Sequence, residues 1–231
     1  MLAVYVVEKE KIFFLGGVPG VGKTSMAGEL AKKFDIKISL SGDYLREDVR
    51  ETIKKLDEMR LLRQDAAASI QYLLSLSVYD AWKYFGEKNT ANILKGFEAQ
   101  SQFMCAGMSA DIRRAVKNGE SIIIESLYIN QSLIDTITEN STIAAYLYIS
   151  DFETHVKRLN EREEYSHFNS PGSRLVAQLD IYREIMTFSE GLSKRNGIPT
   201  FDVLDFAGMM KSVLDYASES SRKGIISKTV S

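Results

Sequence analysis

The chain has 231 residues, and its 29 Lys and Arg residues nearly balance its 31 Asp and Glu residues. This balance gives no whole-chain positive field of the kind that binds nucleic acid, and a single cysteine, Cys105, excludes an intramolecular disulfide framework. No apolar run is long enough to span a membrane, and the N-terminus lacks a signal-peptide layout. We therefore expect a soluble cytoplasmic protein, with neither nucleic acid nor a membrane among its partners.

In chain order, the first strong pattern is an apolar, β-prone run over residues 11–15. A glycine-rich segment and a helical pattern over residues 25–34 follow it. An earlier β-prone run, residues 2–7, is a candidate for a hairpin strand. Residues 36–40 alternate like a half-buried strand, and residues 44–82 favour helix almost throughout.

After a polar break at residues 87–94, a second long helix is expected over residues 96–117. The remaining elements expected are strands at 121–124, 142–149 and 199–203 and helices at 151–162, 174–194 and 208–217. From residue 218 onward we expect the polar end of the chain to fray.

Strands that alternate with helices predict an α/β fold, in which a parallel sheet with right-handed crossovers carries helices on both faces. We expect one domain over residues 1–231. The helical region of about residues 44–117 is longer than a single crossover. We interpret it as an insertion over the carboxyl ends of the strands, where open α/β sheets bind ligands. A helical cap with a purely structural role is the alternative.

The glycine-rich segment reads Gly-Gly-Val-Pro-Gly-Val-Gly-Lys-Thr over residues 16–24 and matches the phosphate-loop pattern. Backbone N–H groups of such a loop surround phosphate oxygens at the positive end of the following helix. We expect Lys23 to reach the β- and γ-phosphates and Thr24 to ligate Mg²⁺. The sequence therefore predicts a site for a nucleoside triphosphate. Its expected residues are Gly17, Val18, Gly20, Val21, Gly22, Lys23, Thr24 and Ser25.

Two charged residues, Asp43 and Arg46, follow the second expected strand. We expect Asp43 to orient or deprotonate a substrate hydroxyl, or to act on Mg²⁺ through a water. We expect Arg46 to clamp a phosphate or carboxylate of the substrate. A helix N-cap aspartate with a solvent-exposed arginine is the alternative reading of the same segment.

Glu125 ends the most apolar strand of the chain, which is the position of a Walker-B-type acid that holds Mg²⁺ through a water. We expect this strand to lie beside the phosphate-loop strand, which favours that role over a charged residue that merely ends a strand. Either Glu125 or Asp43 could be the catalytic base, and the sequence does not decide between them.

Arg158 and Arg162 lie four residues apart on one predicted helix face, and Arg174 follows the polar stretch after them. Helix, polar loop and helix with flanking arginines is the layout of a closing lid, here about residues 159–174. We expect the lid to exclude water, and Arg158 and Arg162 to stabilise charge on the transferring phosphoryl group. A surface helix whose arginines pair with nearby glutamates is the alternative.

Arg113 is a further candidate for binding an anionic substrate, with a solvent-exposed position as the alternative. His155, His167 and Cys105 match no metal-ligand spacing, so we expect no metal site built from them.

With these residues in view, the chain resembles the archaeal 2-phosphoglycerate kinases, a branch of the P-loop kinases, from about Ile12 to Val203. Beyond the phosphate loop, the resemblance rests on residues 43–46, 77–82, 96–100 and 124–125 and on His155, Arg158 and Arg162. It implies the P-loop kinase fold, ATP and Mg²⁺ as cofactors, and phosphorylation of a small hydroxy acid that already carries a phosphate.

The chain departs from this family at two places. Where the family has Glu-Gly-Val-His, a hydrophobic residue and Pro, residues 125–130 read Glu-Ser-Leu-Tyr-Ile-Asn, and Gly42 stands in place of a threonine. Two acceptors stay open, 2-phosphoglycerate and mevalonate 3-phosphate, the second phosphorylated on its 5-hydroxyl. A nucleoside monophosphate kinase and a non-catalytic ATP-binding regulator are the alternatives. The oligomeric state is also open, with a homodimer as one alternative.

Overall fold

The computed structural model describes residues 10–165 and 172–226, except for the side chains of residues 65, 162–165 and 223–226. The strand expected at residues 2–7 lies outside the described residues. In the described ranges the strands are β1 (Ile12–Gly16), β2 (Ile38–Ser41), β3 (Ile122–Ser126), β4 (Ile143–Tyr148) and β5 (Thr200–Asp202). The helices are α1 (Lys23–Phe34), α2 (Gly42–Glu58), α3 (Gln64–Ser75), α4 (Thr90–Asn118), α5 (Gln131–Glu139), α6 (Phe152–Tyr165), α7 (Gly172–Val176), α8 (Leu179–Arg195) and α9 (Phe206–Ile226), with a 3₁₀ helix, η1 (Val78–Tyr84), before α4.

The strands form one parallel sheet in the order β2-β3-β1-β4-β5. The phosphate-loop strand β1 lies at the centre, and β3 pairs with it directly, as predicted. In this register Glu125 is aligned with Leu15 on one side and with Ser41 on the other. The strand ends that carry polar side chains therefore meet at one edge of the sheet, next to the loop after β1.

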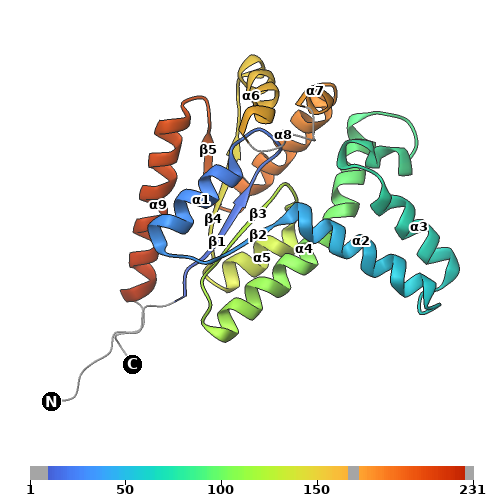
Figure 1. The fold of residues 1–231 in the computed structure, drawn as a ribbon, viewed down its shortest axis with the longest axis horizontal. Coiled ribbons are helices and arrows are strands. Elements are labelled where there is room, and N and C mark those ends of the chain that lie inside the picture. The colour runs from blue at the N-terminus through green and yellow to red at the C-terminus, as the bar shows by residue number, and fades with distance from the viewer. Residues whose placement is uncertain (1–9, 166–171, 227–231) are drawn as a thin grey trace.

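The sheet lies between two layers of helices (Figure 1). Helices α1 and α9 cover one face, and α4, α5 and α8 cover the other. Every residue of β1 and β3 is buried, as expected for central parallel strands. The predicted α/β fold, with a parallel sheet covered on both faces, is confirmed.

The helical region after β2 is divided more finely than predicted. Instead of one run over residues 44–82 it contains α2, α3 and η1. Arg60 adopts a left-handed conformation (φ 55°), which an α-helix does not accommodate and which follows the end of α2. Figure 1 shows α2 and α3 projecting to one side of the sheet.

Two helix boundaries differ from the prediction, the start of α4 and the end of α9. Helix α4 begins at residue 90, inside the predicted break, because the side chain of Asn89 accepts a hydrogen bond from Asn92 N (2.9 Å). It ends at Gly119 in a left-handed conformation, as the Asn-Gly pair indicates. Helix α9 continues to residue 226, so the fraying expected from residue 218 does not begin there.

Helix α5 was not predicted. It connects β3 to β4, and its N-cap is Asn130, whose side chain accepts a hydrogen bond from Leu133 N (2.9 Å). An Asn followed by apolar residues at helical spacing, Leu133, Ile134 and Ile137, is the signal that could have identified it.

Within residues 10–165 and 172–226, no helix is both long and apolar enough to cross a membrane.

Candidate active site

The phosphate loop joins β1 to α1 through glycines in unusual backbone conformations. Gly20 and Gly22 have φ angles of 86° and 85°, a region that residues with a β-carbon rarely occupy. A β-carbon on Gly22 would also lie 2.5 Å from the Phe206 ring, at the start of α9. Glycine is therefore required at position 22 both by the turn and by the neighbour that packs on it.

The predicted nucleotide-binding residues divide into two groups. Gly20, Gly22, Lys23, Thr24 and Ser25 line a cavity of about 1020 Å³ at this end of the sheet. The side chains of Val18 and Val21 are instead buried in the core, and Gly17 N donates a hydrogen bond to Ser126 O (3.1 Å). Any contribution from Val18 and Val21 would therefore come from their backbone.

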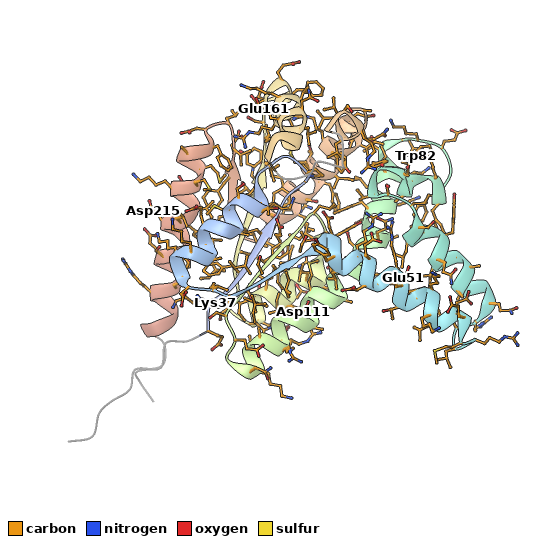
Figure 2. All side chains as sticks on the ribbon, viewed as in Figure 1. Lys37, Glu51, Trp82, Asp111, Glu161 and Asp215 are labelled. Atoms are coloured by element: carbon orange, nitrogen blue, oxygen red, sulfur yellow. The ribbon has the colours of Figure 1, made fainter. Side chains whose placement is uncertain are left out.

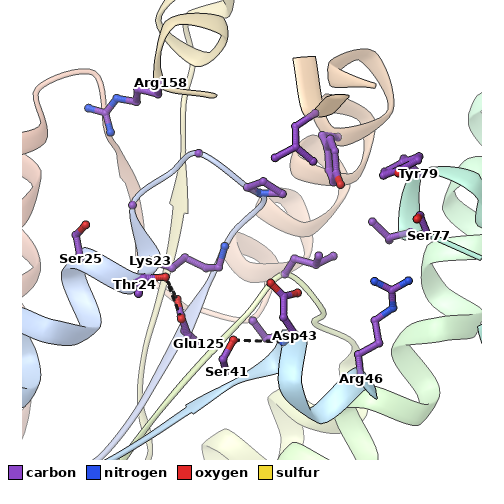
Figure 3. Close-up of a pocket in the computed structure, with 18 of the residues that line it drawn as sticks. Lys23, Thr24, Ser25, Ser41, Asp43, Arg46, Ser77, Tyr79, Glu125 and Arg158 are labelled. Atoms are coloured by element: carbon purple, nitrogen blue, oxygen red, sulfur yellow. Dashed lines mark hydrogen bonds between the residues drawn. The ribbon is translucent and has the colours of Figure 1, made fainter. Parts of the chain in front are cut away.

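Lys23 and Thr24 begin α1 and point toward the mouth of the loop. Lys23 Nζ donates a hydrogen bond to Val18 O (3.1 Å), which holds the ammonium group over the loop. Thr24 Oγ1 donates to the carboxylate of Glu125, at 3.0 Å from Oε1 and 2.9 Å from Oε2 (Figure 3). The hydroxyl and carboxylate oxygens converge beside the loop, as the predicted roles of Thr24 and Glu125 require.

These oxygens fit Mg²⁺, which prefers oxygen ligands and commonly takes one or two from the protein, with the others from water and phosphate. Among the described residues no group of three or more His, Cys, Asp and Glu side chains could hold a metal by itself. The donor set at Thr24 and Glu125 therefore suits a cation that arrives with a phosphorylated ligand.

Asp43 lies across the cavity from Thr24, in the first turn of α2. The side chain of Ser41 caps this helix by accepting a hydrogen bond from Asp43 N (3.3 Å). Figure 3 shows the Asp43 carboxylate directed into the cavity, on the side of Lys23. The carboxylate that contacts Thr24 is that of Glu125, while the Asp43 carboxylate faces the open cavity (Figure 3).

Arg46 lies one turn after Asp43 and also lines the cavity. Its Nη2 donates a hydrogen bond to Leu76 O (2.8 Å), just after the end of α3. Part of the guanidinium group thus caps a helix end, where a cation is favourable. Figure 3 shows its end directed toward Ser77 at the cavity wall.

Gly42 and Ser126, one residue from each departure from the family pattern, lie against each other. A β-carbon on Gly42 would lie 2.5 Å from Ser126 Oγ. The serine hydroxyl thus occupies the space that a larger side chain at position 42 would need. This contact gives one physical reason why Gly42 and Ser126 occur together in this chain.

The structure does not place Arg158 as predicted. Its Nη2 donates to Val203 O, and its guanidinium group lies 4.9 Å from the centre of the Phe206 ring. Arg158 lines the cavity on the α9 side, but in this structure it is directed away from Lys23 (Figure 3). The reason is that the α6 face carrying Arg158 packs toward the segment after β5. The Arg162 side chain lies outside the described residues.

Arg113 is not at the cavity. It is exposed near the end of α4, with Nη1 3.5 Å from Thr136 Oγ1 of α5. Helix α4 leads into the parallel strand β3, so its final turns lie at the edge of the sheet opposite to the strand end at Glu125. Figure 2 shows Asp111, in the same part of α4, far from Glu161 on α6. The solvent-exposed alternative is the one that the structure supports.

His155 contributes to the site in a way that the sequence did not indicate. It is 0% exposed on α6, and its Nε2 lies 2.8 Å from Pro19 O in the phosphate loop. A carbonyl can only accept, so Nε2 carries the hydrogen. A β-carbon on Gly20 would lie 3.2 Å from this ring. The imidazole therefore supports the phosphate loop from the side of α6.

Burial lowers the pKa of His155 below its ordinary value of 6.5, and Nδ1 is buried without a hydrogen-bond partner. The unfolded chain therefore binds a second proton on His155 more tightly than the folded protein does. For this reason the free energy of unfolding does not depend on the titration of His155 above pH 6.5, and it falls by at most about 1.4 kcal/mol per pH unit as the pH drops below that value.

His155→Gln should flatten this pH dependence, because glutamine retains an N–H donor for Pro19 O but does not titrate. Urea unfolding of both proteins between pH 7.5 and pH 5.5 measures the difference. An equal loss of stability in the two proteins would show that His155 is not the group responsible.

Several cavity residues carried no recognisable sequence signal. Tyr44, Tyr182 and Phe206 line the cavity, and so does Leu175 beside the predicted lid residue Arg174. Tyr79 faces Tyr182 edge-on, with ring centres 5.9 Å apart. Tyr44 and Tyr79 lie in segments that the family resemblance marks, but the sequence assigns no role to either. Leu175, Tyr182 and Phe206 are brought to the cavity by α7, α8 and α9, which are distant from the loop in sequence.

The comparisons with known proteins agree with this geometry. A family model described as "AAA domain" matches residues 16–126, from the phosphate loop to the end of β3. Mevalonate-3-phosphate 5-kinase of Thermoplasma acidophilum is 41% identical over 205 residues, which cover 89% of this chain and 94% of that protein. The chain belongs to the P-loop kinase family that includes mevalonate-3-phosphate 5-kinase.

A more distant relative by sequence supports the resemblance to the 2-phosphoglycerate kinases. The 2-phosphoglycerate kinase of Methanothermobacter thermautotrophicus is 25% identical over 215 residues, 92% of this chain and 67% of that protein. Among solved structures, shikimate kinase from Acinetobacter baumannii matches with a TM-score of 0.49 and 14% identity over 97% of each chain. As a member of this family the protein is a phosphotransferase with a P-loop nucleotide site.

Proposed function

We propose that the protein transfers the γ-phosphoryl group of ATP to the 5-hydroxyl of mevalonate 3-phosphate. The observation that carries this proposal is the 41% identity to a mevalonate-3-phosphate 5-kinase, which extends over 94% of that protein. The identity to a 2-phosphoglycerate kinase over a similar share of this chain is 25%. The larger value favours mevalonate 3-phosphate as the acceptor over 2-phosphoglycerate.

The phosphate loop and Lys23 hold the nucleotide in this proposal. Loop N–H groups and the Lys23 ammonium bind the phosphate oxygens, and Thr24 and Glu125 would hold Mg²⁺. When bound, Mg²⁺ neutralises charge on the β- and γ-phosphate oxygens. His155 keeps the loop in place through Pro19 O.

Asp43 acts on the acceptor. Its carboxylate accepts the proton of the 5-hydroxyl as the hydroxyl oxygen attacks the γ-phosphorus. The bond from that phosphorus to the oxygen bridging to the β-phosphate breaks, and ADP leaves. Because both oxygens of Glu125 accept from Thr24, Asp43 is the better placed of the two carboxylates for this role.

The rest of the acceptor is anionic and needs cations at the cavity wall. Arg46 and Arg174 line the cavity, and we assign them to the carboxylate and the 3-phosphate. Tyr79 and Tyr182 border the same space. We propose that residues 44–117 form the acceptor-side insertion of a single kinase domain.

We also propose that residues 159–174 act as a lid over the phosphates. Glu161 of α6 and Arg174 of α7, near the two ends of this range, line the cavity, and so does Leu175 directly after it. Residues 166–171 lie outside the described residues. Arg158 lies at the nucleotide side, against Phe206, and we expect it to contact the nucleotide. The transition-state role of Arg162 remains a prediction.

Acceptor-dependent release of ADP tests the kinase proposal against the alternative of a non-catalytic ATP-binding regulator. With MgATP and mevalonate 3-phosphate, we expect steady ADP formation that greatly exceeds the rate without acceptor. ADP formation that no acceptor accelerates, with nucleoside monophosphates and 2-phosphoglycerate included, would contradict the proposal.

A further inference from the structure

One backbone carbonyl links the acceptor side of the cavity to the protein core. Leu76 O accepts hydrogen bonds from Arg46 Nη2 (2.8 Å), Arg50 Nη2 (3.2 Å) and Gln100 Nε2 (3.0 Å). Leu76 directly precedes residues 77–79, all of which line the cavity. The position of this carbonyl therefore affects both the Arg46 guanidinium group and a wall of the pocket.

Gln100 holds this carbonyl from the core side. Its side chain, on α4, is 1% exposed, and Nε2 donates to Leu73 O (2.9 Å) as well as to Leu76 O. An amide nitrogen has two hydrogens, so both are used and the orientation of the side chain is set. The last carbonyls of a helix lack partners within it, and Gln100 supplies donors at this end of α3.

Tyr128 fixes Gln100 from the other side. Its hydroxyl donates to Gln100 Oε1 (2.9 Å), and its ring is 0% exposed and stacks on Phe97 with 7° between the ring planes. Burial raises the pKa of Tyr128 to about 12, so the hydroxyl keeps its hydrogen at neutral pH. Tyr128 N in turn donates to Ser126 Oγ (3.0 Å), at the end of β3.

We propose that Tyr128 and Gln100 are positioning residues for the acceptor substrate: through Leu76 they hold Arg46 and the wall of residues 77–79 in place relative to the end of β3. These hydrogen bonds run from Ser126 through Tyr128 and Gln100 to Leu76 and Arg46, and none of them involves Glu125. The inference rests on the proposed function, because it assigns Arg46 to the acceptor.

Tyr128→Phe is the direct test. The variant loses one hydroxyl but keeps the ring that stacks on Phe97. Loss of one buried hydrogen bond should raise the KM for mevalonate 3-phosphate about five- to tenfold. The KM for ATP should stay within about twofold of wild type, because the four hydrogen bonds from Ser126 to Arg46 lie on the acceptor side.

Tyr146→Phe is the matched control. Tyr146 is also 0% exposed, but it lies on β4, away from Leu76. This variant should change stability without changing the KM for the acceptor. The proposal would be overturned if Tyr128→Phe and Tyr146→Phe had the same KM for mevalonate 3-phosphate. It would also be overturned if the KM for ATP rose in Tyr128→Phe as much as the KM for mevalonate 3-phosphate.

A double variant tests whether Tyr128 acts through Gln100. Gln100→Leu should raise the acceptor KM at least as much as Tyr128→Phe, and adding Tyr128→Phe to it should cause little further change. If the fold increases in acceptor KM of the two single variants multiply in the double variant, Tyr128 does not act through Gln100. If Gln100→Leu does not fold, the comparison of the two tyrosine variants still decides the question.

Amide hydrogen exchange gives a readout that needs no substrate. Residues 77–84 should exchange faster in Tyr128→Phe than in wild type and Tyr146→Phe, because their anchor at Leu76 is loosened. Unchanged exchange in Tyr128→Phe would overturn the connection from Tyr128 to the wall. If the wild-type protein transfers nothing to mevalonate 3-phosphate, the proposed acceptor fails, while the exchange result still decides whether the wall depends on Tyr128.

Discussion

Lys23→Ala should lower kcat by about 10²–10³-fold, because phosphoryl transfer depends on positioned positive charge. The ammonium group sits over the phosphate loop, 3.1 Å from Val18 O, and no other described lysine lines the cavity. Alanine removes the charge but is compatible with the first turn of α1. Steady-state kinetics at saturating MgATP and acceptor measures the effect.

Lys32→Ala is the matched control for this variant. Lys32 is exposed in the last turn of the same helix, so its loss should leave kcat nearly unchanged. A Lys23→Ala enzyme that works at a near-normal rate, or a Lys32→Ala enzyme that is equally impaired, would contradict the assignment of Lys23 to the phosphates.

Asp43→Asn should lower kcat about 10²-fold or more and leave the KM for ATP nearly unchanged, because a proton acceptor is removed while the shape of the side chain is kept. The carboxylate faces the cavity from the first turn of α2. Asp48→Asn, on the same helix and exposed, should have no such effect. A variant in which only the KM for ATP rises would show that Asp43 does not act on the acceptor.

Glu125→Gln distinguishes the two carboxylates. Because Glu125 accepts from Thr24 with both oxygens, its amide variant should need a higher Mg²⁺ concentration for half-maximal rate. Asp43→Asn should not change this Mg²⁺ dependence. The reverse pattern would exchange the roles of Asp43 and Glu125.

The nucleotide half of the site could be predicted from sequence because its signals are local. The phosphate loop follows a short apolar run directly, and Glu125 ends a run of three isoleucines. In a parallel sheet the carboxyl ends of adjacent strands meet at one edge, so placing β3 beside β1 was enough to bring Glu125 to Thr24.

The acceptor half could be predicted only in part, because it depends on how distant helices pack. Asp43 and Arg46 were found since they follow a strand directly. Arg113 was misplaced because its location depends on the direction in which α4 approaches β3. The sequence pattern places Arg158 on the correct helix. It does not indicate the partners of Arg158, because Val203 and Phe206 belong to a segment about 45 residues later in the chain.

The role of Gln100 lies beyond what sequence patterns indicate. At helical spacing it falls among core residues of α4, such as Phe97 and Met104. A buried glutamine is informative only when its partners are known, since it must be hydrogen-bonded. Its partners are carbonyls at the end of α3 and the hydroxyl of Tyr128, which no local pattern connects.

A competition assay tests the central claim most directly. The enzyme is incubated with MgATP and equal concentrations of mevalonate 3-phosphate and 2-phosphoglycerate, and both products are quantified by mass spectrometry during the initial phase of the reaction. We expect mevalonate 3-phosphate to gain one phosphoryl group, on its 5-hydroxyl, well before 2-phosphoglycerate is consumed. Faster phosphorylation of 2-phosphoglycerate, or phosphorylation of neither compound, would contradict the proposed acceptor.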